Sequence, residues 1–326
     1  MQLKRKIIVL LCFLISCANV YPARVLAYDQ AEASCVSQEL PWEIIIGGEA
    51  GDRYSDNQQY ETDWNCPSLV IGEERVRIIE DEDLDADGRS LKIDLPPGMI
   101  GADSSQGGQV QIRSTLAKGY DTIYGTFKLR FDENFNFVSG GKVGIGFCGG
   151  CCPTGGQDAS CGWSVRTAFW GDGRLDLYIY HYGQAGVYGE HFPFGRPLRP
   201  GQTYVIEIFV RLDDPGESNG EAKVWVDYAE VLHLQDMCFR NTDGKEAKQV
   251  MLTAFFGGDT REQYAPKKTE TLYIGDIGFY ENRPAAMQSK AVDIIIQNDT
   301  TIDDERDSTK GCFIDTVYNS DGDNSI

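Results

Sequence analysis

Three tyrosines alternate with apolar residues in the segment 174–182. In an extended strand, successive side chains point to opposite faces, so Tyr178, Tyr180 and Tyr182 share one face. A row of phenols can stack on sugar rings and bond to their hydroxyl groups. The alternative is purely structural, because tyrosines favour strands and form cross-strand pairs.

A hydroxyl and a cation share one face of the segment 163–170, where Ser164 and Arg166 are two residues apart. Lys142 lies earlier in the chain, in a glycine-rich segment. If these segments lie close together, one face carries phenols, a guanidinium and an amine. A polar, aromatic face of this kind suits a carbohydrate.

Strands must position these side chains, because period-two patterns dominate the chain. Such patterns occur at 127–131, 204–212, 223–227 and 272–280, and turn sequences such as Asn219-Gly220 separate them. Long apolar stripes at helical spacing are scarce. The sequence therefore predicts an all-β fold, an antiparallel β-sandwich or jelly roll, with one domain over residues 40–283.

The composition excludes several classes of protein. With 326 residues, 41% hydrophobic and 25% charged, the chain can bury a full core and is not disordered throughout. Its net charge of -20 makes it a poor partner for nucleic acid or anionic membranes. A polyanionic substrate requires basic residues to gather in one cleft. We expect a monomer.

Residues 1–27 resemble a secretory signal peptide. Basic residues 4–6 precede an apolar run, Ile7 to Ile15, that is too short to span a membrane. We therefore expect secretion; a lipid anchor at Cys17 is the alternative. At the other end, residues 284–326 are expected to form an acidic C-terminal extension.

An even number of cysteines follows the leader, which favours disulfides in an oxidising compartment. The disulfide candidates are Cys35, Cys66, Cys148, Cys151, Cys152, Cys161, Cys238 and Cys312. Zinc is the alternative for the cluster at 148–161, but two separated CxxC pairs are lacking. We expect bridges that close this loop at its base.

One acidic segment resembles a calcium-binding loop, because Asp83, Asp85 and Asp87 alternate before Gly88. The residues that follow, 90–95, have the pattern of a strand and not of a helix. A structural calcium ion at these aspartates is one interpretation, and an acidic turn is the other.

Several motifs together resemble polysaccharide lyase family 14, which includes alginate and polyglucuronate lyases. The resemblance covers residues 85–280 and rests on the order and spacing of Gly140-Gly-Lys142, Trp163-Ser-Val-Arg166, Leu177-Tyr-Ile-Tyr180, Val224-Trp-Val-Asp227 and Phe255-Phe-Gly-Gly258. It implies a β-jelly roll. It also implies that the catalytic residues are Lys142, Ser164, Arg166, Tyr178 and Tyr180.

The implied reaction is β-elimination, which removes the C5 proton of a uronate and expels the 4-linked oxygen. Arg166 or Lys142 would stabilise the charge that develops at the carboxylate. Tyr178, Tyr180 or Lys142 would transfer the proton, and Ser164 would orient its neighbours. The reaction requires no cofactor. Alginate is the first substrate we expect, and polyglucuronate the second.

Four further residues are candidates for substrate binding: Gln111, Arg113, His181 and Tyr182. The alternatives are ordinary sheet surface for the first two and a structural, hydrogen-bonded role for His181 and for the nearby His191. The cysteine-rich insert lies beside the expected cleft, where it can alter the preference for substrate length or linkage.

Two other functions are alternatives to a lyase. A retaining glycosidase requires two carboxylates close together on one face, and the candidate face is instead cationic and phenolic. A non-catalytic glycan-binding jelly roll is the stronger rival, since fold alone does not determine function.

Overall fold

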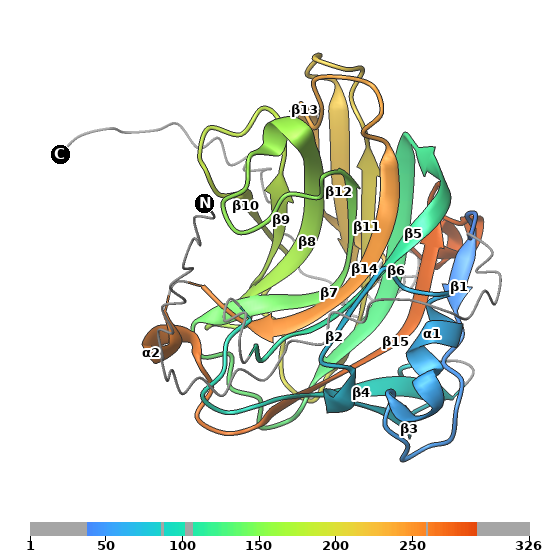
Figure 1. The fold of residues 1–326 in the computed structure, drawn as a ribbon, viewed down its shortest axis with the longest axis vertical. Coiled ribbons are helices and arrows are strands. Elements are labelled where there is room, and N and C mark those ends of the chain that lie inside the picture. The colour runs from blue at the N-terminus through green and yellow to red at the C-terminus, as the bar shows by residue number, and fades with distance from the viewer. Residues whose placement is uncertain (1–37, 86–87, 102–106, 259, 292–326) are drawn as a thin grey trace, which may run out of the picture. The chain divides into compact units, whose positions relative to one another are not determined.

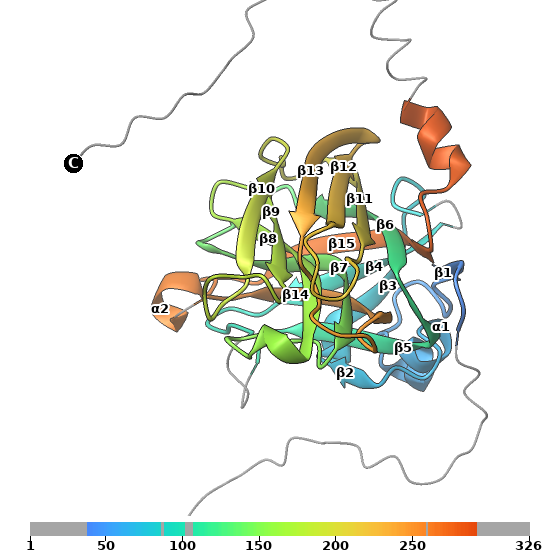
Figure 2. The same ribbon diagram turned by 90° about the horizontal axis from the view of Figure 1, so that it is seen from above.

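Two antiparallel β-sheets pack face to face to form a sandwich (Figures 1 and 2). This computed structural model describes residues 38–85, 88–101, 107–258 and 260–291. The predicted leader at 1–27, with Cys17, lies outside the described residues, as do Cys35, Cys312 and the extension from residue 292 onward. The described start of that extension, residues 285–291, is helical.

Within the described residues, the first sheet has eight strands. Across it, the order is β13 (Ala229–Met237), β12 (Gly220–Val226), β11 (Thr203–Arg211), β6 (Thr122–Phe131), β15 (Glu270–Tyr280), β4 (Arg89–Leu95) and β3 (Val76–Glu80), and β1 (Trp42–Ile44) also pairs with β15. The strands predicted at 127–131, 204–212, 223–227 and 272–280 all lie in this sheet and are confirmed.

The second sheet, which carries the candidate site, has seven strands in the part of the chain that the structure describes. Its order is β10 (Glu190–Phe194), β9 (Leu175–Tyr180), β8 (Gly162–Trp170), β7 (Gly140–Gly150), β14 (Ala247–Phe256), β5 (Val110–Tyr120) and β2 (Leu69–Ile71). Figure 1 shows β9, β8, β7 and β14 side by side.

The helices that carry a label are short. They are η1 (Asp56–Gln58), α1 (Gln59–Asp63), η2 (Glu73–Arg75), η3 (Ala159–Cys161) and α2 (Arg261–Tyr264). No helix among the described residues is both long and apolar enough to cross a membrane. The prediction of a mostly β fold is confirmed.

The core lies between the two sheets and explains why the strands alternate. Phe127, Leu129 and Phe131 of β6 are fully buried, and Leu177 and Ile179 of β9 join the same cluster from the other sheet. Burying apolar surface is the main driving force for this packing. In each strand of the second sheet, every other side chain therefore points to the outer face, away from the core.

Candidate active site

The outer face of the second sheet carries the residues that the sequence predicted to be catalytic. In β9, Leu175, Leu177 and Ile179 are buried in the core, which leaves Tyr178 and Tyr180 on the other side. The adjacent strand β8 supplies Ser164 and Arg166 in the same way, and β7, on the far side of β8, supplies Lys142.

Strand register aligns several of these residues in one row across the sheet. Arg166 lies opposite Tyr178 of β9 and opposite Gly146 of β7. The row continues from Gly146 to Met251 of β14 and then to Arg113 of β5. The antiparallel pairing therefore places two arginines and a tyrosine across one stretch of the face.

Lys142 contacts this row at Tyr178, because its amine lies over the face of the Tyr178 ring. Its Nζ lies 3.9 Å from the centroid of the Tyr178 ring. Burial and the nearby Arg166 cation lower the pKa of Lys142 to about 7, although Asp176 acts in the opposite direction. The amine is thus poised to exchange a proton near neutral pH.

Arg166 is a buried cation without a carboxylate partner among the described residues, and only 6% of it is exposed. Burial and the positive charge of Arg113 lower the pKa of Arg166 to about 10. Its Nη1 donates to Thr154 Oγ1 at 2.9 Å, while its Nε and Nη2 are buried and make no hydrogen bond. Unpaired buried donors are costly, so these two groups are suited to an incoming anion.

Arg113 and Gln111, two of the residues proposed from the sequence to bind substrate, extend the polar face onto β5. Burial lowers the pKa of Arg113, and its Nε makes no hydrogen bond. The buried Gln111 Nε2 is also unpaired, as is Thr253 Oγ1, which lies opposite Gln111 in β14. Sequence analysis missed Thr253.

The two tyrosines of β9 are coupled by a hydrogen bond. Tyr178 Oη donates to Tyr180 Oη at 3.2 Å, and burial and then this bond raise the pKa of Tyr178. Tyr180 Oη also accepts from the backbone N–H of Gly156 at 2.8 Å. The Tyr180 oxygen therefore accepts two hydrogen bonds, which leaves its own proton available.

Ser164 lies on the same face, but its hydroxyl is already occupied. It is 1% exposed, and its Oγ donates to the carbonyl of Pro153 at 2.7 Å. The hydroxyl therefore holds a loop beside the site, in line with the orienting role considered for this residue.

His191 and Asp176 join the cluster, and neither was among the predicted site residues. His191 lies opposite Tyr178, and the two ring centroids are 4.4 Å apart. Its Nδ1 is 3.3 Å from the buried carboxylate of Asp176, which also accepts from Trp170 Nε1 at 2.6 Å. Asp176 shares the face of Tyr178 by simple alternation, a signal that was present in the sequence.

His181 is buried, and protein atoms contact both of its ring nitrogens. Nε2 lies 3.0 Å from Glu190 Oε2, and Nδ1 lies 3.3 Å from the carbonyl of Cys238. No ring nitrogen remains for a substrate, and the hydrogen-bonded alternative describes this residue.

Tyr182 does not extend the tyrosine row, which corrects the expectation that 174–182 is one strand. The strand ends at Tyr180 because the chain then enters the connection to β10, and Tyr182 N–H donates instead to the carbonyl of Phe239. Tyr182 is 46% exposed. It lines a hollow of about 380 Å³ with Gln184, Val187, Gly156, Gln157 and Asp158.

Two disulfides close the cysteine-rich loop, as expected. They join Cys148 to Cys152 and Cys151 to Cys161. Cys66 is also disulfide-bonded. Cys238 was expected to form a bridge, and this is wrong: its thiol is free and lies 3.9 Å from the carbonyl of Arg240 as a weak donor.

The acidic segment after β3 lies on the other sheet. Asp83 is exposed, whereas Asp85 is buried and accepts from the backbone N–H of Asp276 at 3.0 Å. Asp87 is not among the described residues. In the part of the chain that the structure covers, no three His, Cys, Asp or Glu side chains gather as metal ligands would.

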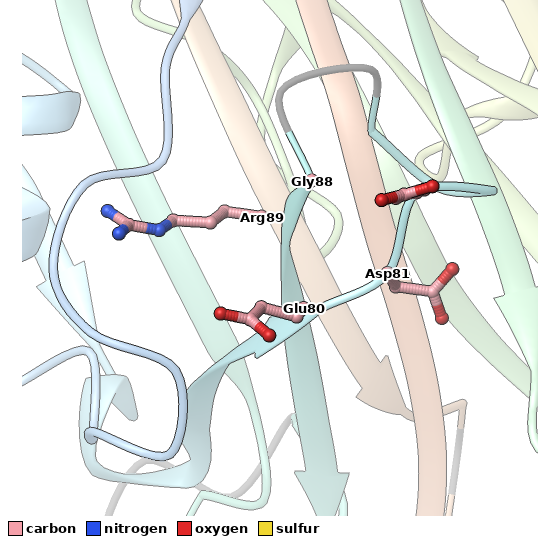
Figure 3. Close-up of a pocket in the computed structure, with 5 residues that line it drawn as sticks. Glu80, Asp81, Gly88 and Arg89 are labelled. Atoms are coloured by element: carbon pink, nitrogen blue, oxygen red, sulfur yellow. The ribbon is translucent and has the colours of Figure 1, made fainter.

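A hollow of about 450 Å³ lies beside this segment. Figure 3 shows its lining, which consists of Glu80, Asp81, Glu82, Gly88 and Arg89. Three carboxylates against one guanidinium make it an unsuitable place for a polyanion.

Comparison with protein families gives one match. The family model described as Polysaccharide lyase 14 matches residues 83–277. No curated protein matches the chain.

Solved structures show the same fold at low sequence identity. A variant of the alginate lyase Aly36B, in complex with an alginate tetrasaccharide, is 20% identical with a TM-score of 0.65, covering 76% of this chain and 99% of its own. The PL-14 alginate lyase from Aplysia kurodai is 17% identical with a TM-score of 0.61, covering 74% and 98%. The alginate lyase vAL-1 from Chlorella virus is 17% identical with a TM-score of 0.56, covering 72% and 100%.

Proposed function

The chain belongs to polysaccharide lyase family 14, and from that premise we propose that it cleaves a uronate polymer by β-elimination at the outer face of β7, β8 and β9. The preferred substrate in this proposal is alginate, with polyglucuronate second. The products are then oligosaccharides with a 4,5-unsaturated sugar at the new non-reducing end.

One observation carries the proposal: two arginines lie on this face without an ion-pair partner among the described residues. Arg166 and Arg113 make no ion pair with any described residue, and both have buried N–H groups that lack an acceptor. Lys142 adds a third basic group. In a chain with a net charge of -20, such a cluster is a specific place for a carboxylate.

Elimination places negative charge where this cluster can stabilise it. Removal of the C5 proton delocalises an electron pair into the neighbouring carboxylate, which would otherwise carry two negative charges. The free Nε and Nη2 of Arg166 form a planar pair of donors that matches a carboxylate. Donors that are already in place stabilise charge that develops in the transition state.

In the proposed mechanism, Lys142 takes the C5 proton and Tyr180 gives one to the leaving oxygen. A pKa of about 7 means that a substantial fraction of Lys142 is neutral at neutral pH and can act as a base. Tyr178 keeps its proton because its pKa is raised, and its O–H donates a hydrogen bond to the oxygen of Tyr180. The proton of Tyr180 then remains for the substrate.

The similar structures from Aplysia kurodai and Chlorella virus are both named as alginate lyases, which supports alginate as the first substrate to test. We also propose that the protein is secreted and acts as a monomer. The disulfides of the described loop support an oxidising compartment. The proposed chemistry uses protein side chains alone.

The test is the ultraviolet absorbance of the unsaturated product while the purified protein acts on alginate, polyglucuronate and a neutral glucan in turn. We expect absorbance to rise with a uronan and not with the glucan. Arg166→Ala should abolish the rise, because the carboxylate loses its main partner. Arg211→Ala removes an exposed arginine from the other sheet and should leave the rate unchanged.

The opposite results are equally informative. If no uronan gives a rise but Lys142→Ala and the wild type both bind the polymer, the protein is a glycan-binding module. Full activity of Arg166→Ala would remove that residue from the mechanism.

A further inference from the structure

The loop Cys151–Cys161, here called the stapled loop, joins β7 to β8 beside the candidate site. The Cys151–Cys161 disulfide closes its base, where Cys151 N–H also donates to the carbonyl of Cys161 at 3.0 Å. The Cys148–Cys152 disulfide ties its first residues to β7. Two covalent links within so short a segment restrict the conformations that the loop can adopt.

A tight turn from Thr154 to Gln157 brings the Thr154 hydroxyl and the Gly156 N–H of the stapled loop to the site. Thr154 N–H donates to the side chain of Gln157 at 3.1 Å, and Gln157 N–H donates back to the carbonyl of Thr154 at 3.1 Å. Gly155 and Gly156, between them, have φ values of 58° and 81°. Because L-residues with a Cβ rarely adopt this conformation, the two glycines make the turn possible.

Three hydrogen bonds connect the stapled loop to three of the five predicted catalytic residues. Ser164 Oγ donates to the carbonyl of Pro153, and Arg166 Nη1 donates to Thr154 Oγ1. The backbone N–H of Gly156 donates to Tyr180 Oη. These contacts are 2.7, 2.9 and 2.8 Å long, and all lie on the site face.

The contact with Thr154 determines which edge of the Arg166 guanidinium is free. Thr154 Oγ1 occupies Nη1, whereas Nε and Nη2 remain unpaired. On the opposite side, Gly146 leaves room for the arginine, since a Cβ there would lie 3.3 Å from Arg166 Cγ. Without this hydrogen bond, the side chain could rotate about its terminal torsions, and the Nε and Nη2 edge would no longer face in one direction.

We propose that the stapled loop is part of the catalytic apparatus, in which Thr154 is a positioning residue that aims the Nε and Nη2 edge of Arg166 at the substrate carboxylate. The inference rests on the proposed function, and it identifies the residue that orients the Arg166 guanidinium. It also assigns a purpose to the disulfides: they hold the turn, and so Thr154, at a fixed place above β8.

The decisive experiment compares Thr154→Val with Thr154→Ser in steady-state kinetics on a uronan. Valine keeps the shape of threonine and removes the acceptor oxygen, so kcat should fall by at least about tenfold while KM changes less, as expected for a misplaced charge-stabilising group. Serine keeps the oxygen and should restore most of kcat. Thermal unfolding should be similar for both variants.

Two further variants complete the design. Thr271→Val is the matched control, because it removes a threonine hydroxyl that bonds to Asp94 in the other sheet and should leave kcat unchanged. The double variant Cys151→Ser with Cys161→Ser should lower kcat in the same way as Thr154→Val, because the turn is no longer held. Wild-type kcat in that double variant would overturn the role assigned to the disulfide.

Failure of this inference differs from failure of the proposed function. If the wild type cleaves a uronan and Thr154→Val keeps full kcat, the function stands and the role of Thr154 is overturned. If the wild type releases no unsaturated product, the lyase proposal fails, and calorimetric affinity for a uronate tetrasaccharide decides the inference. In that case, Thr154→Val should bind at least about tenfold more weakly and Thr154→Ser should not; equal affinities, or no binding by the wild type, overturn it.

Discussion

At the scale of single residues, the candidate site is governed by burial and by like charges held close together. Burial and then the Arg166 cation lower the pKa of Lys142, and burial and then Arg113 lower that of Arg166. Asp176 is the carboxylate that opposes these effects at Lys142. The ionisation of the proposed base is therefore set by a balance between burial and a cationic neighbour on one side and one buried anion on the other.

The pH dependence of the rate follows from this balance. If neutral Lys142 is the base, kcat/KM should rise with pH through about 7. Asp176→Asn removes the negative charge that favours the protonated amine, so the pKa of Lys142 should fall and the rising limb should move to lower pH. The measurement is kcat/KM against pH, which reports groups of the free enzyme.

Other titrating groups face the same amine and must be separated from it. His191 lies beside Asp176, and its own pKa is lowered by burial and by Lys142. His191→Asn should therefore keep the rising limb assigned to Lys142. Asp172→Asn is a matched control, because Asp172 is an exposed carboxylate in the turn before β9. A limb that moves to higher pH in Asp176→Asn would contradict this assignment.

At the scale of elements, a buried ion pair fixes the segment after the last strand to the first sheet. Arg283, just after β15, donates from Nε and Nη2 to both oxygens of Glu207 in β11, at 2.6 and 3.1 Å. Glu207 is fully buried and also accepts from Tyr124 Oη at 2.7 Å. The guanidinium lies 4.5 Å from the ring centroid of Trp225 in β12. Residues just beyond the last strand are thus part of the fold.

Removal of this arginine should be strongly destabilising. Arg283→Ala leaves the Glu207 carboxylate buried without its cation, which typically costs about 3 to 5 kcal/mol. Arg211→Ala removes an exposed arginine from the same strand as Glu207, and its pair with Glu221 at the sheet surface is worth at most about 1 kcal/mol. Urea unfolding of both variants measures the difference.

The double variant Arg283→Ala with Glu207→Gln tests the cause. It should recover part of the lost stability, because the uncompensated charge is gone. Equal losses in Arg283→Ala and Arg211→Ala would mean that the buried ion pair does not stabilise the first sheet.

At the scale of the whole molecule, a strongly acidic protein is proposed to act on a polyanion. The net charge of -20 repels the substrate at long range, whereas the cations of the site attract it at short range. Salt separates the two effects, since the Debye length falls from about 30 Å at 0.01 M to about 8 Å at 0.15 M.

We therefore expect kcat/KM to rise with salt over this range while kcat stays nearly constant. The long-range repulsion is screened first, and contacts in the partly buried site are screened less. Initial rates on a uronan at several concentrations of sodium chloride provide the measurement. A steady fall of kcat/KM would show instead that local attraction dominates at every distance.

Much of the candidate site follows from local patterns. The alternation in β9 predicts that Tyr178 and Tyr180 share a face, because a strand has a period of two whatever lies beside it. The same rule places Asp176 on that face, although its importance depends on Lys142 and His191. Thr253 has no local signal, because its link to Gln111 depends on β14 pairing with β5.

The sequence by itself therefore determined the all-β class, the faces of the strands and the family. Side-chain alternation and turn residues are local properties, and the motifs keep their order along the chain. Strand order, register and loop closure depend on contacts between residues far apart, which a sequence pattern does not encode. Only the tertiary structure placed Arg113 in the same row as Arg166, left Cys238 as a free thiol and brought Thr154 to the Arg166 guanidinium.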